Sequence, residues 1–276
     1  MDLSLFNPLA LGGVVGLILA LAGAGGGILS VPLLVFGLHL SIVQAAPVGL
    51  VAVGIASAIG AVLGLREGLV RYRAAALIGV TGMLLAPLGV RLAGALPPAP
   101  LTVAFALLLA GVAWRTLQQS RHAARPGAAL APDSQQWPCV LNPDEGRLIW
   151  TLPCAWALAA TGALAGLLSG MLGVGGGFVI VPALGRYTNL ATRSVLATSL
   201  AVIALVSVGA VGAAAWQGSV AWAVAGPFAA GAVIALLAGR RLAARLSGAR
   251  LQQAFALTLA AVALLLLARG LGWVAA

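Results

Sequence analysis

The stretch Gly23-Ala24-Gly25-Gly26-Gly27, with Pro32 five residues beyond it, decides the fold of this chain. It returns 150 residues later as Gly173-Val174-Gly175-Gly176-Gly177 before Pro182 (173 − 23 = 150). Both copies lie inside uncharged, strongly apolar sequence, where a cluster of glycines interrupts a helix. Two copies at a fixed spacing therefore predict a duplicated membrane protein.

The composition agrees with membrane residence. The 276 residues are 62% hydrophobic and only 7% charged, and the mean hydropathy is +1.11. A soluble domain of this length could not cover its surface with so few charges. The net charge of +10 comes from arginines at the ends of apolar runs. This placement is typical of topology determinants beside anionic headgroups, so we expect no nucleic-acid partner.

The chain divides into an N-terminal membrane repeat (1–118), a polar linker (119–147) and a C-terminal membrane repeat (148–276). The two repeats align without a gap at the 150-residue spacing, and the pairs Arg91/Arg241 and Phe105/Phe255 coincide. Each repeat contains four apolar runs, and the eight runs are 3–37, 42–65, 74–96, 99–118, 148–185, 194–215, 220–244 and 251–271.

Run length and arginine placement predict the topology. A helix crosses the hydrocarbon core in about 20 residues, whereas the first run of each half has 35 or 38 residues. We therefore expect that run to fold back at its glycine cluster. Thirteen of the fifteen arginines then lie on one face, with only Arg91 and Arg269 at the other. The positive-inside rule makes that face cytoplasmic.

These observations predict an all-α integral membrane protein. It contains two inverted-topology repeats of about four helical segments each, and the first segment of each is broken and re-entrant at its glycine cluster. Three net crossings per half turn the second repeat upside down. The linker would be cytoplasmic, and both termini would lie outside.

A short helix that begins at a glycine bend near the membrane midplane presents unpaired N–H groups and the positive end of its dipole. Such an end attracts anions, and paired discontinuous helices hold the substrate in repeat-built transporters. Hydroxyl groups beside it suit an oxyanion, although Ser and Thr in membrane helices often bond to their own backbone. The candidate substrate-binding residues are Gly25, Gly26, Gly27, Ser30, Gly175, Gly176, Gly177, Thr198 and Ser199.

Other residues have simpler interpretations. We assign helix packing to glycines outside the clusters: Gly16, Gly54, Gly60, Gly79, Gly82, Gly162 and Gly166. Pro32 and Pro182 are helix-breaking candidates. Arg91, Arg241 and His39 are gating candidates, with snorkelling to headgroups as the alternative for the arginines and a polar loop residue as the alternative for His39. Ser57 and Ser207 form a further repeat-related pair.

Several functions are disfavoured. Every apolar run lacks Asp and Glu, so we expect neither carboxylate-based coupling nor an enzyme active site, and neither a cofactor nor a metal. Cys139 and Cys154 are too few for a disulfide framework. We expect inert thiols, with a redox role as the alternative.

The second copy of the motif, Gly173 to Leu184, followed by Ala197-Thr198-Ser199-Leu200, resembles the TauE/SafE family of bacterial membrane transporters. The first copy departs from it, with Pro47-Val48-Gly49 where the second has Ala197-Thr198-Ser199. The family is also called the sulfite exporter or toluene-sulfonate uptake permease family. The resemblance spans both halves and implies transport of sulfite, sulfoacetate or related sulfonates.

We therefore expect an exporter of small sulfur oxyanions or organosulfonates in the bacterial inner membrane, with a midplane site between the repeats. Uptake of another sulfur compound or small anion is the alternative. The expected partners are a small anionic substrate and the lipid bilayer, and a homodimer remains open.

Overall fold

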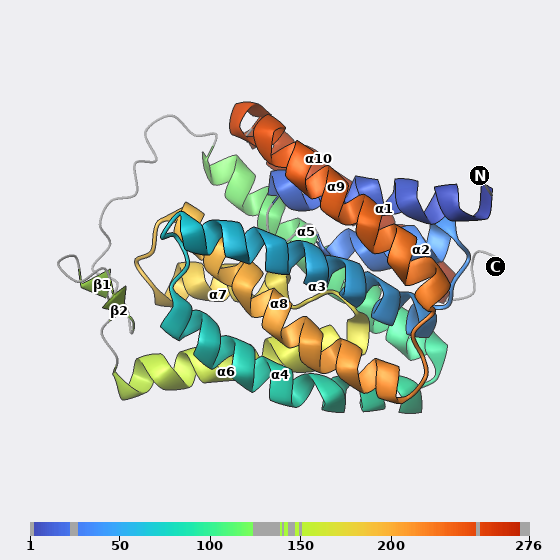
Figure 1. The fold of residues 1–276 in the computed structure, drawn as a ribbon, viewed down its shortest axis with the longest axis horizontal. Coiled ribbons are helices and arrows are strands. Elements are labelled where there is room, and N and C mark those ends of the chain that lie inside the picture. Colours follow the sequence, from blue (N-terminus) through green and yellow to red (C-terminus); the bar gives the residue numbers. More distant parts are fainter. Residues whose placement is uncertain are drawn as a thin grey trace.

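The computed structural model describes residues 3–22, 27–123, 139, 141–142, 147–148, 151–246 and 249–270 (Figure 1). The described part of the first half folds into five helices: α1 (Leu3–Ala22), α2 (Ser30–Gly37), α3 (Ile42–Arg66), α4 (Tyr72–Ala95) and α5 (Pro98–Ala123). The second half has α6 (Leu152–Leu172), α7 (Gly177–Tyr187), α8 (Thr192–Trp216), α9 (Trp222–Leu246) and α10 (Ala249–Gly270). Between the halves, β1 (Leu141–Asn142) and β2 (Arg147–Leu148) pair antiparallel.

The predicted all-α membrane class is confirmed. Among the described residues, six helices are long and apolar enough to cross a membrane: α3, α4, α6, α8, and the larger parts of α5 and α9. Shorter apolar helical stretches lie in α1, in and just before α2, and in α10. A chain with this many spans is a multi-pass membrane protein.

The long first run of each half is interrupted at its glycines. In the second half, α6 ends at Leu172 and α7 begins at Gly177, and Gly173, Gly175 and Gly176 between them all have φ near +74°. Only glycine adopts this left-handed conformation without a steric cost. In the first half, Gly23–Gly26 lie outside the described residues, and Gly27–Leu29 form a 3₁₀ turn that leads into α2.

The short helix then runs back along the helix before it. Cys139 is bonded to Cys154 near the start of α6, and its N–H donates to the carbonyl of Tyr187 at the end of α7 (3.1 Å). The α6–α7 hairpin thus begins and ends at the same end of the bundle. In the first half, Gly37 at the end of α2 lies against the Leu11 side chain of α1.

Helices of one half pack against helices of the other (Figure 1). The first helix of each half lies along the fourth helix of the other half: α1 against α9, and α6 against α4. The third helices, α3 and α8, pack on each other at the centre, and the fifth helices, α5 and α10, pair at the periphery. Exchanging the two halves leaves this pattern of neighbours unchanged.

The turn after each central helix is also duplicated. Gly68 and Gly218 have φ of +69° and +67°. The next residue in each turn donates its N–H to a carbonyl five positions back: Leu69 to Gly64, and Ser219 to Ala214, both at 3.0 Å. This is the bonding of a glycine-terminated helix end, which satisfies carbonyl groups that the helix leaves open.

Glycines outside the clusters pack the long helices together. Gly16 lies against the backbone of Ala232, and Gly166 lies against that of Gly82. A Cβ placed on any of the other glycines assigned to packing from the sequence would lie closer to a neighbouring helix than an ordinary contact allows. These glycines are Gly54, Gly60, Gly79, Gly82 and Gly162. Close approach of small residues is the usual way membrane helices associate, because lipid supplies no hydrophobic drive between them.

The expectation of two inert thiols is wrong. Cys139 and Cys154 form a disulfide across 15 residues, and both are fully buried. The cysteine count correctly excludes a framework of several bridges, but a single bond needs only two cysteines whose backbones approach each other. The fold provides that approach (Cα–Cα 5.0 Å) by setting Cys139 between the start of α6 and the end of α7.

Candidate functional site

The two glycine breaks meet beside the central helix α3. A Cβ placed on Gly27 would lie 2.9 Å from the side chain of Val53 and 3.4 Å from the carbonyl oxygen of Val174. A Cβ on Gly175 would lie 3.2 Å from Val53 and 3.0 Å from Ile203 of α8. Val53 therefore lies beside both clusters, which also approach each other directly at Gly27 and Val174. The described parts of both clusters share one buried junction between α3 and α8.

Close backbone contact explains why residues of the second cluster are glycines. A Cβ on Gly173 would collide with the backbone of Ala46 in α3. A Cβ on Gly176 would lie 3.0 Å from the carbonyl oxygen of Ala165 in α6. Both residues also have left-handed backbone conformations. The turn is therefore held against two helices and is not a freely moving loop.

The start of α7 presents backbone donors at this junction. The N–H groups of Val179 and Ile180 both donate to the carbonyl oxygen of Gly176, at 3.0 and 3.1 Å. Gly177 and Phe178 precede them, in the first turn, where helix geometry provides no intrahelical acceptor. The positive end of the helix dipole lies at the same place. This combination suits an anionic group.

Three hydroxyl groups predicted to bind substrate have partners within the protein. Ser30 Oγ donates to the carbonyl oxygen of Gly27 (2.7 Å), and Ser199 Oγ donates to that of Val195 (2.8 Å). Thr198 Oγ1 accepts the N–H of Arg71 (3.0 Å) and so caps the start of α4. All three hydroxyl-bearing residues are fully buried. The bonds of Ser30 and Ser199 fit the back-bonding alternative weighed from the sequence, whereas the cap that Thr198 provides was not among the alternatives.

Three other serines carry buried hydroxyl groups that lack a hydrogen-bond partner: Ser57 in α3, Ser169 in α6 and Ser207 in α8. Ser57 and Ser207 lie one helical turn beyond Val53 and Ile203, which contact the glycine junction. A buried hydroxyl without a partner costs about 1–3 kcal/mol, so such groups are expected where a ligand or water supplies the bond. The repeat relationship of Ser57 and Ser207 was the sequence signal for them; no pattern distinguished Ser169.

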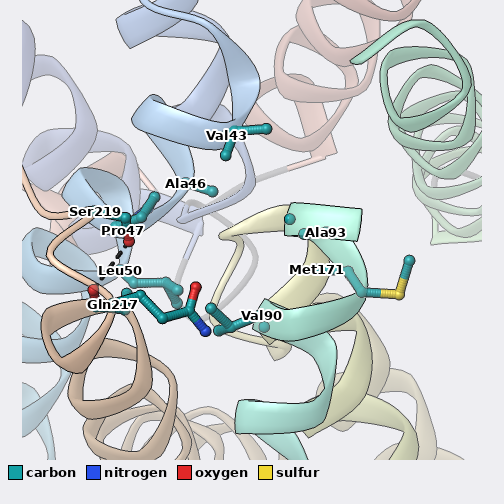
Figure 2. Close-up of a pocket in the computed structure, with 12 residues that line it drawn as sticks. Val43, Ala46, Pro47, Leu50, Val90, Ala93, Met171, Gln217 and Ser219 are labelled. Carbon is teal, nitrogen blue, oxygen red and sulfur yellow. Dashed lines mark hydrogen bonds between the residues drawn. The ribbon is translucent and has the colours of Figure 1, made fainter. Parts of the chain in front are cut away.

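A small cavity of about 40 Å³ borders the second cluster, between the start of α3, the end of α4 and the turn after α8 (Figure 2). Ala46, which meets Gly173, lines it together with Leu50 of α3. Gln217, from the turn after α8, directs its amide group into it (Figure 2). The cavity has room for about three water molecules, so the conformation described here is narrow on this side of the junction.

The remaining predicted residues lie farther away. Arg91 is exposed near the end of α4, and Arg241 lies in α9 with its side chain outside the described part of the structure. His39 is exposed in the turn between α2 and α3, with φ of 53°. Helix α7 continues through Pro182, and Pro32 lies in the first turn of α2. The glycines, and not the prolines, interrupt the helices. Gly25 and Gly26 lie outside the described residues.

The many-span helical fold, with two interrupted helices meeting at its centre, defines a multi-pass membrane protein of the transporter class. The model of the sulfite exporter TauE/SafE family matches residues 9–266. The chain therefore belongs to the TauE/SafE family.

Similar proteins carry the name of the same class. Probable membrane transporter proteins from Xylella fastidiosa strains 9a5c and Temecula1 are each 30% identical to this chain over 268 residues. The alignments cover 95% of this chain and 94% of each relative. No solved structure gives a significant match.

Proposed function

We propose that this protein exports small sulfur oxyanions or organosulfonates, such as sulfite or sulfoacetate, through a site at the glycine junction between the two repeats. The observation that carries the proposal is the meeting of Gly27 and Gly175 on Val53, with the start of α7 and partnerless serine hydroxyls close by. Oxyanions accept hydrogen bonds from such N–H and O–H donors. The name of the family supports the substrate class.

Export is the favoured direction on electrical grounds. The apolar runs of the sequence contain no Asp or Glu that could carry a coupled proton or cation. An inside-negative potential expels an anion with about 2.3 kcal/mol per charge for every 100 mV. Flux measured in proteoliposomes should therefore follow an imposed potential. Flux that does not respond to the potential but follows a pH gradient would count against potential-driven export, to which uptake of a sulfur compound or small anion is the alternative.

The proposed membrane orientation places the linker in the cytoplasm and both termini outside the inner membrane, with the second repeat inverted relative to the first. Helix pairing that is unchanged on exchanging the halves supports the inverted repeats. The ends of α4 and α10 carry Arg91 and Arg269, the two arginines assigned to the outer face. Reporter fusions in the linker and at the C-terminus test this orientation. A linker reporter that is active only outside the cytoplasm contradicts it.

Substrate binding can be measured by thermal unfolding of the purified protein with sulfite, thiosulfate, taurine, sulfoacetate and aromatic sulfonates. At least one oxyanion should stabilise the wild type, and the double variant Ser57→Ala/Ser207→Ala should respond more weakly. Thr258→Val is the matched control, because that exposed hydroxyl donates to Ala254 within its own helix. Stabilisation by a cation or a neutral solute alone would overturn the anion site. An equal response of wild type and double variant would remove the serines from it.

A further inference from the structure

A second cavity, which shares no lining residue with the small cavity at the glycine junction, lies between α5, α6 and α7. Its volume is about 510 Å³, which is within the range of about 300–1,000 Å³ typical of ligand pockets. Most of its lining is apolar, including Leu108 of α5, Leu164 of α6 and Val179 of α7. Arg115 and Arg186 also line it, and no carboxylate is among its lining residues in the described part of the chain. We call this cavity the basic groove.

The exposed side chains beside the basic groove indicate that it faces lipid. Trp114, adjacent to Arg115, is 63% exposed, and Trp156 at the start of α6 is 70% exposed. Leu107 and Leu164, which lie nearer the middle of the membrane-spanning parts of α5 and α6 than these tryptophans do, are also exposed. Exposed tryptophans mark the membrane interface, and exposed leucines mark the hydrocarbon region. The arginines therefore lie near headgroup level, and the apolar part of the groove extends toward the acyl chains.

The corresponding place in the repeat, where α10 takes the position of α5 and α1 and α2 take those of α6 and α7, lacks the same arginines. Leu265 and Phe36 occupy the positions that correspond to Arg115 and Arg186 at the 150-residue spacing. There Gly37 lies against Leu11, and the guanidinium of Arg269 lies 6.0 Å from the centre of the Phe36 ring. The repeat architecture alone does not require a basic groove. The pair of arginines beside an apolar channel, one from α5 and one from α7, therefore belongs to this groove and is not repeated at its symmetry-related counterpart.

We propose that the basic groove binds one anionic glycerophospholipid, with an acyl chain along α5, α6 and α7 and the phosphate between Arg115 and Arg186. Guanidinium groups match phosphate oxygens with paired hydrogen bonds. Basic pockets between membrane helices on the cytoplasmic side are suited to anionic headgroups. A freely soluble anion would use the arginines but leave the apolar channel empty, so a lipid fits more of the groove.

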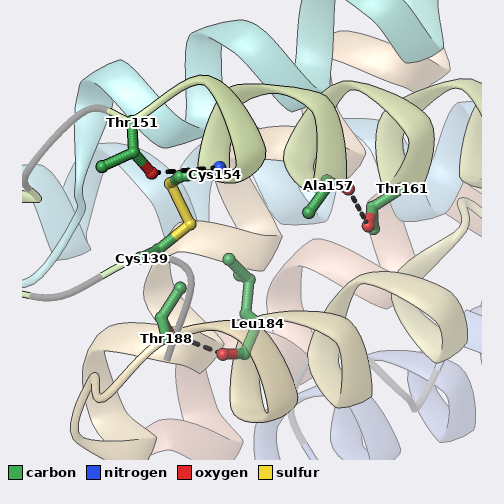
Figure 3. The surroundings of a disulfide bond; sticks show 7 residues. All are labelled: Cys139, Thr151, Cys154, Ala157, Thr161, Leu184 and Thr188. Atoms are coloured by element: carbon green, nitrogen blue, oxygen red, sulfur yellow. Dashed lines mark hydrogen bonds between the residues drawn. A yellow bond between two sulfur atoms is a disulfide. The ribbon is translucent and has the colours of Figure 1, made fainter. Parts of the chain in front are cut away.

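The groove also borders the interrupted helix. Val179 and Pro182 of α7 line it, and α7 is the helix whose start forms part of the glycine junction. The disulfide lies at the same end, where Cys139 joins the start of α6 to the end of α7 (Figure 3). A bound lipid would therefore pack directly against the re-entrant helix and stabilise its position.

Lipid binding can be tested with the full-length protein in neutral detergent. Native mass spectrometry would give affinities for phosphatidylglycerol and phosphatidylcholine with identical acyl chains. The wild type should prefer phosphatidylglycerol. The variant Arg115→Gln/Arg186→Gln should bind it about 30-fold more weakly, which corresponds to about 1 kcal/mol for each arginine at about 1.4 kcal/mol per tenfold change. Phosphatidylcholine affinity should change much less.

Matched controls separate the groove from general surface charge and from a soluble anion. Arg193→Gln removes an exposed arginine near the start of α8, outside the groove, and should leave phosphatidylglycerol affinity unchanged. Ala160→Phe fills the groove from an exposed position on α6 and should weaken binding of both lipids. Unchanged affinity in either groove variant overturns the proposal, as does binding of glycerol 3-phosphate as tight as that of phosphatidylglycerol.

Discussion

Replacing glycines of positive φ by alanine separates backbone strain from close packing at the glycine junction. Gly68, Gly173 and Gly176 have nearly the same φ, from +69° to +74°. Their surroundings differ. A Cβ on Gly68 meets nothing within 4 Å, one on Gly176 meets Ala165 at 3.0–3.3 Å, and one on Gly173 collides with the backbone of Ala46.

The expected loss of unfolding free energy follows that order. Gly68→Ala carries the left-handed strain alone, about 1–2 kcal/mol. Gly173→Ala adds displacement of a packed backbone, for which overpacking costs are about 1–3 kcal/mol, so its total should reach about 2–5 kcal/mol. Gly176→Ala should lie between them, because its neighbour is in tight contact and must move by only a few tenths of an ångström.

The assay is unfolding of each purified variant in the same detergent, followed through tryptophan fluorescence, together with binding of the oxyanion that stabilises the wild type. If the start of α7 holds the substrate, Gly173→Ala and Gly176→Ala should weaken binding as well as stability, whereas Gly68→Ala should retain wild-type affinity. A Gly173→Ala protein no less stable than Gly68→Ala would refute the packed junction. Wild-type affinity in both cluster variants would assign those glycines to structure alone.

Three further predictions concern stability. Cys139→Ser should lower the unfolding free energy of the oxidised protein by about 3 kcal/mol, the value for a closed loop of about 15 residues. A reductant should lower the stability of the wild type by the same amount and leave the variant unchanged. Equal stability of the oxidised and reduced wild type would contradict this. Thr198→Val should cost about 1 kcal/mol because the N–H of Arg71 loses its cap, and Thr198→Ser should restore it. Gly166→Ala should lower the unfolding free energy by about 1–3 kcal/mol, because the new Cβ meets the backbone of α4. Gly226→Ala is the control: its Cβ meets open space, so the unfolding free energy should stay the same or rise slightly.

The disulfide also bears on the proposed orientation. Disulfides persist in oxidising compartments and are kept reduced in the cytoplasm, whereas the arginine distribution favours a cytoplasmic linker. Under that orientation, Cys139 and Cys154 should be reduced in growing cells and should oxidise only under stress. Because both cysteines are buried, the measurement is acid quenching of the cells followed by alkylation of free thiols in denaturant. Complete oxidation in unstressed cells would contradict the cytoplasmic linker.

The sequence alone determined the membrane class, the duplication and the interruption of one helix in each half. These properties depend on local composition: glycine clusters interrupt helices, apolar runs need lipid, and a repeat appears as matching residues at constant spacing. It also identified packing glycines such as Gly16 and Gly166, because small residues in long apolar helices have few other uses.

Only the tertiary structure decided which residues share surroundings. Thr198 caps a helix 127 residues away in the sequence, and Ser199 bonds to its own helix, while Ser57 and Ser207 keep partnerless hydroxyl groups. The Cys139–Cys154 bond likewise depends on α7 returning to the start of α6. Sequence shows that a side chain can donate a hydrogen bond, but the partner is set by long-range packing, and local patterns do not contain that information.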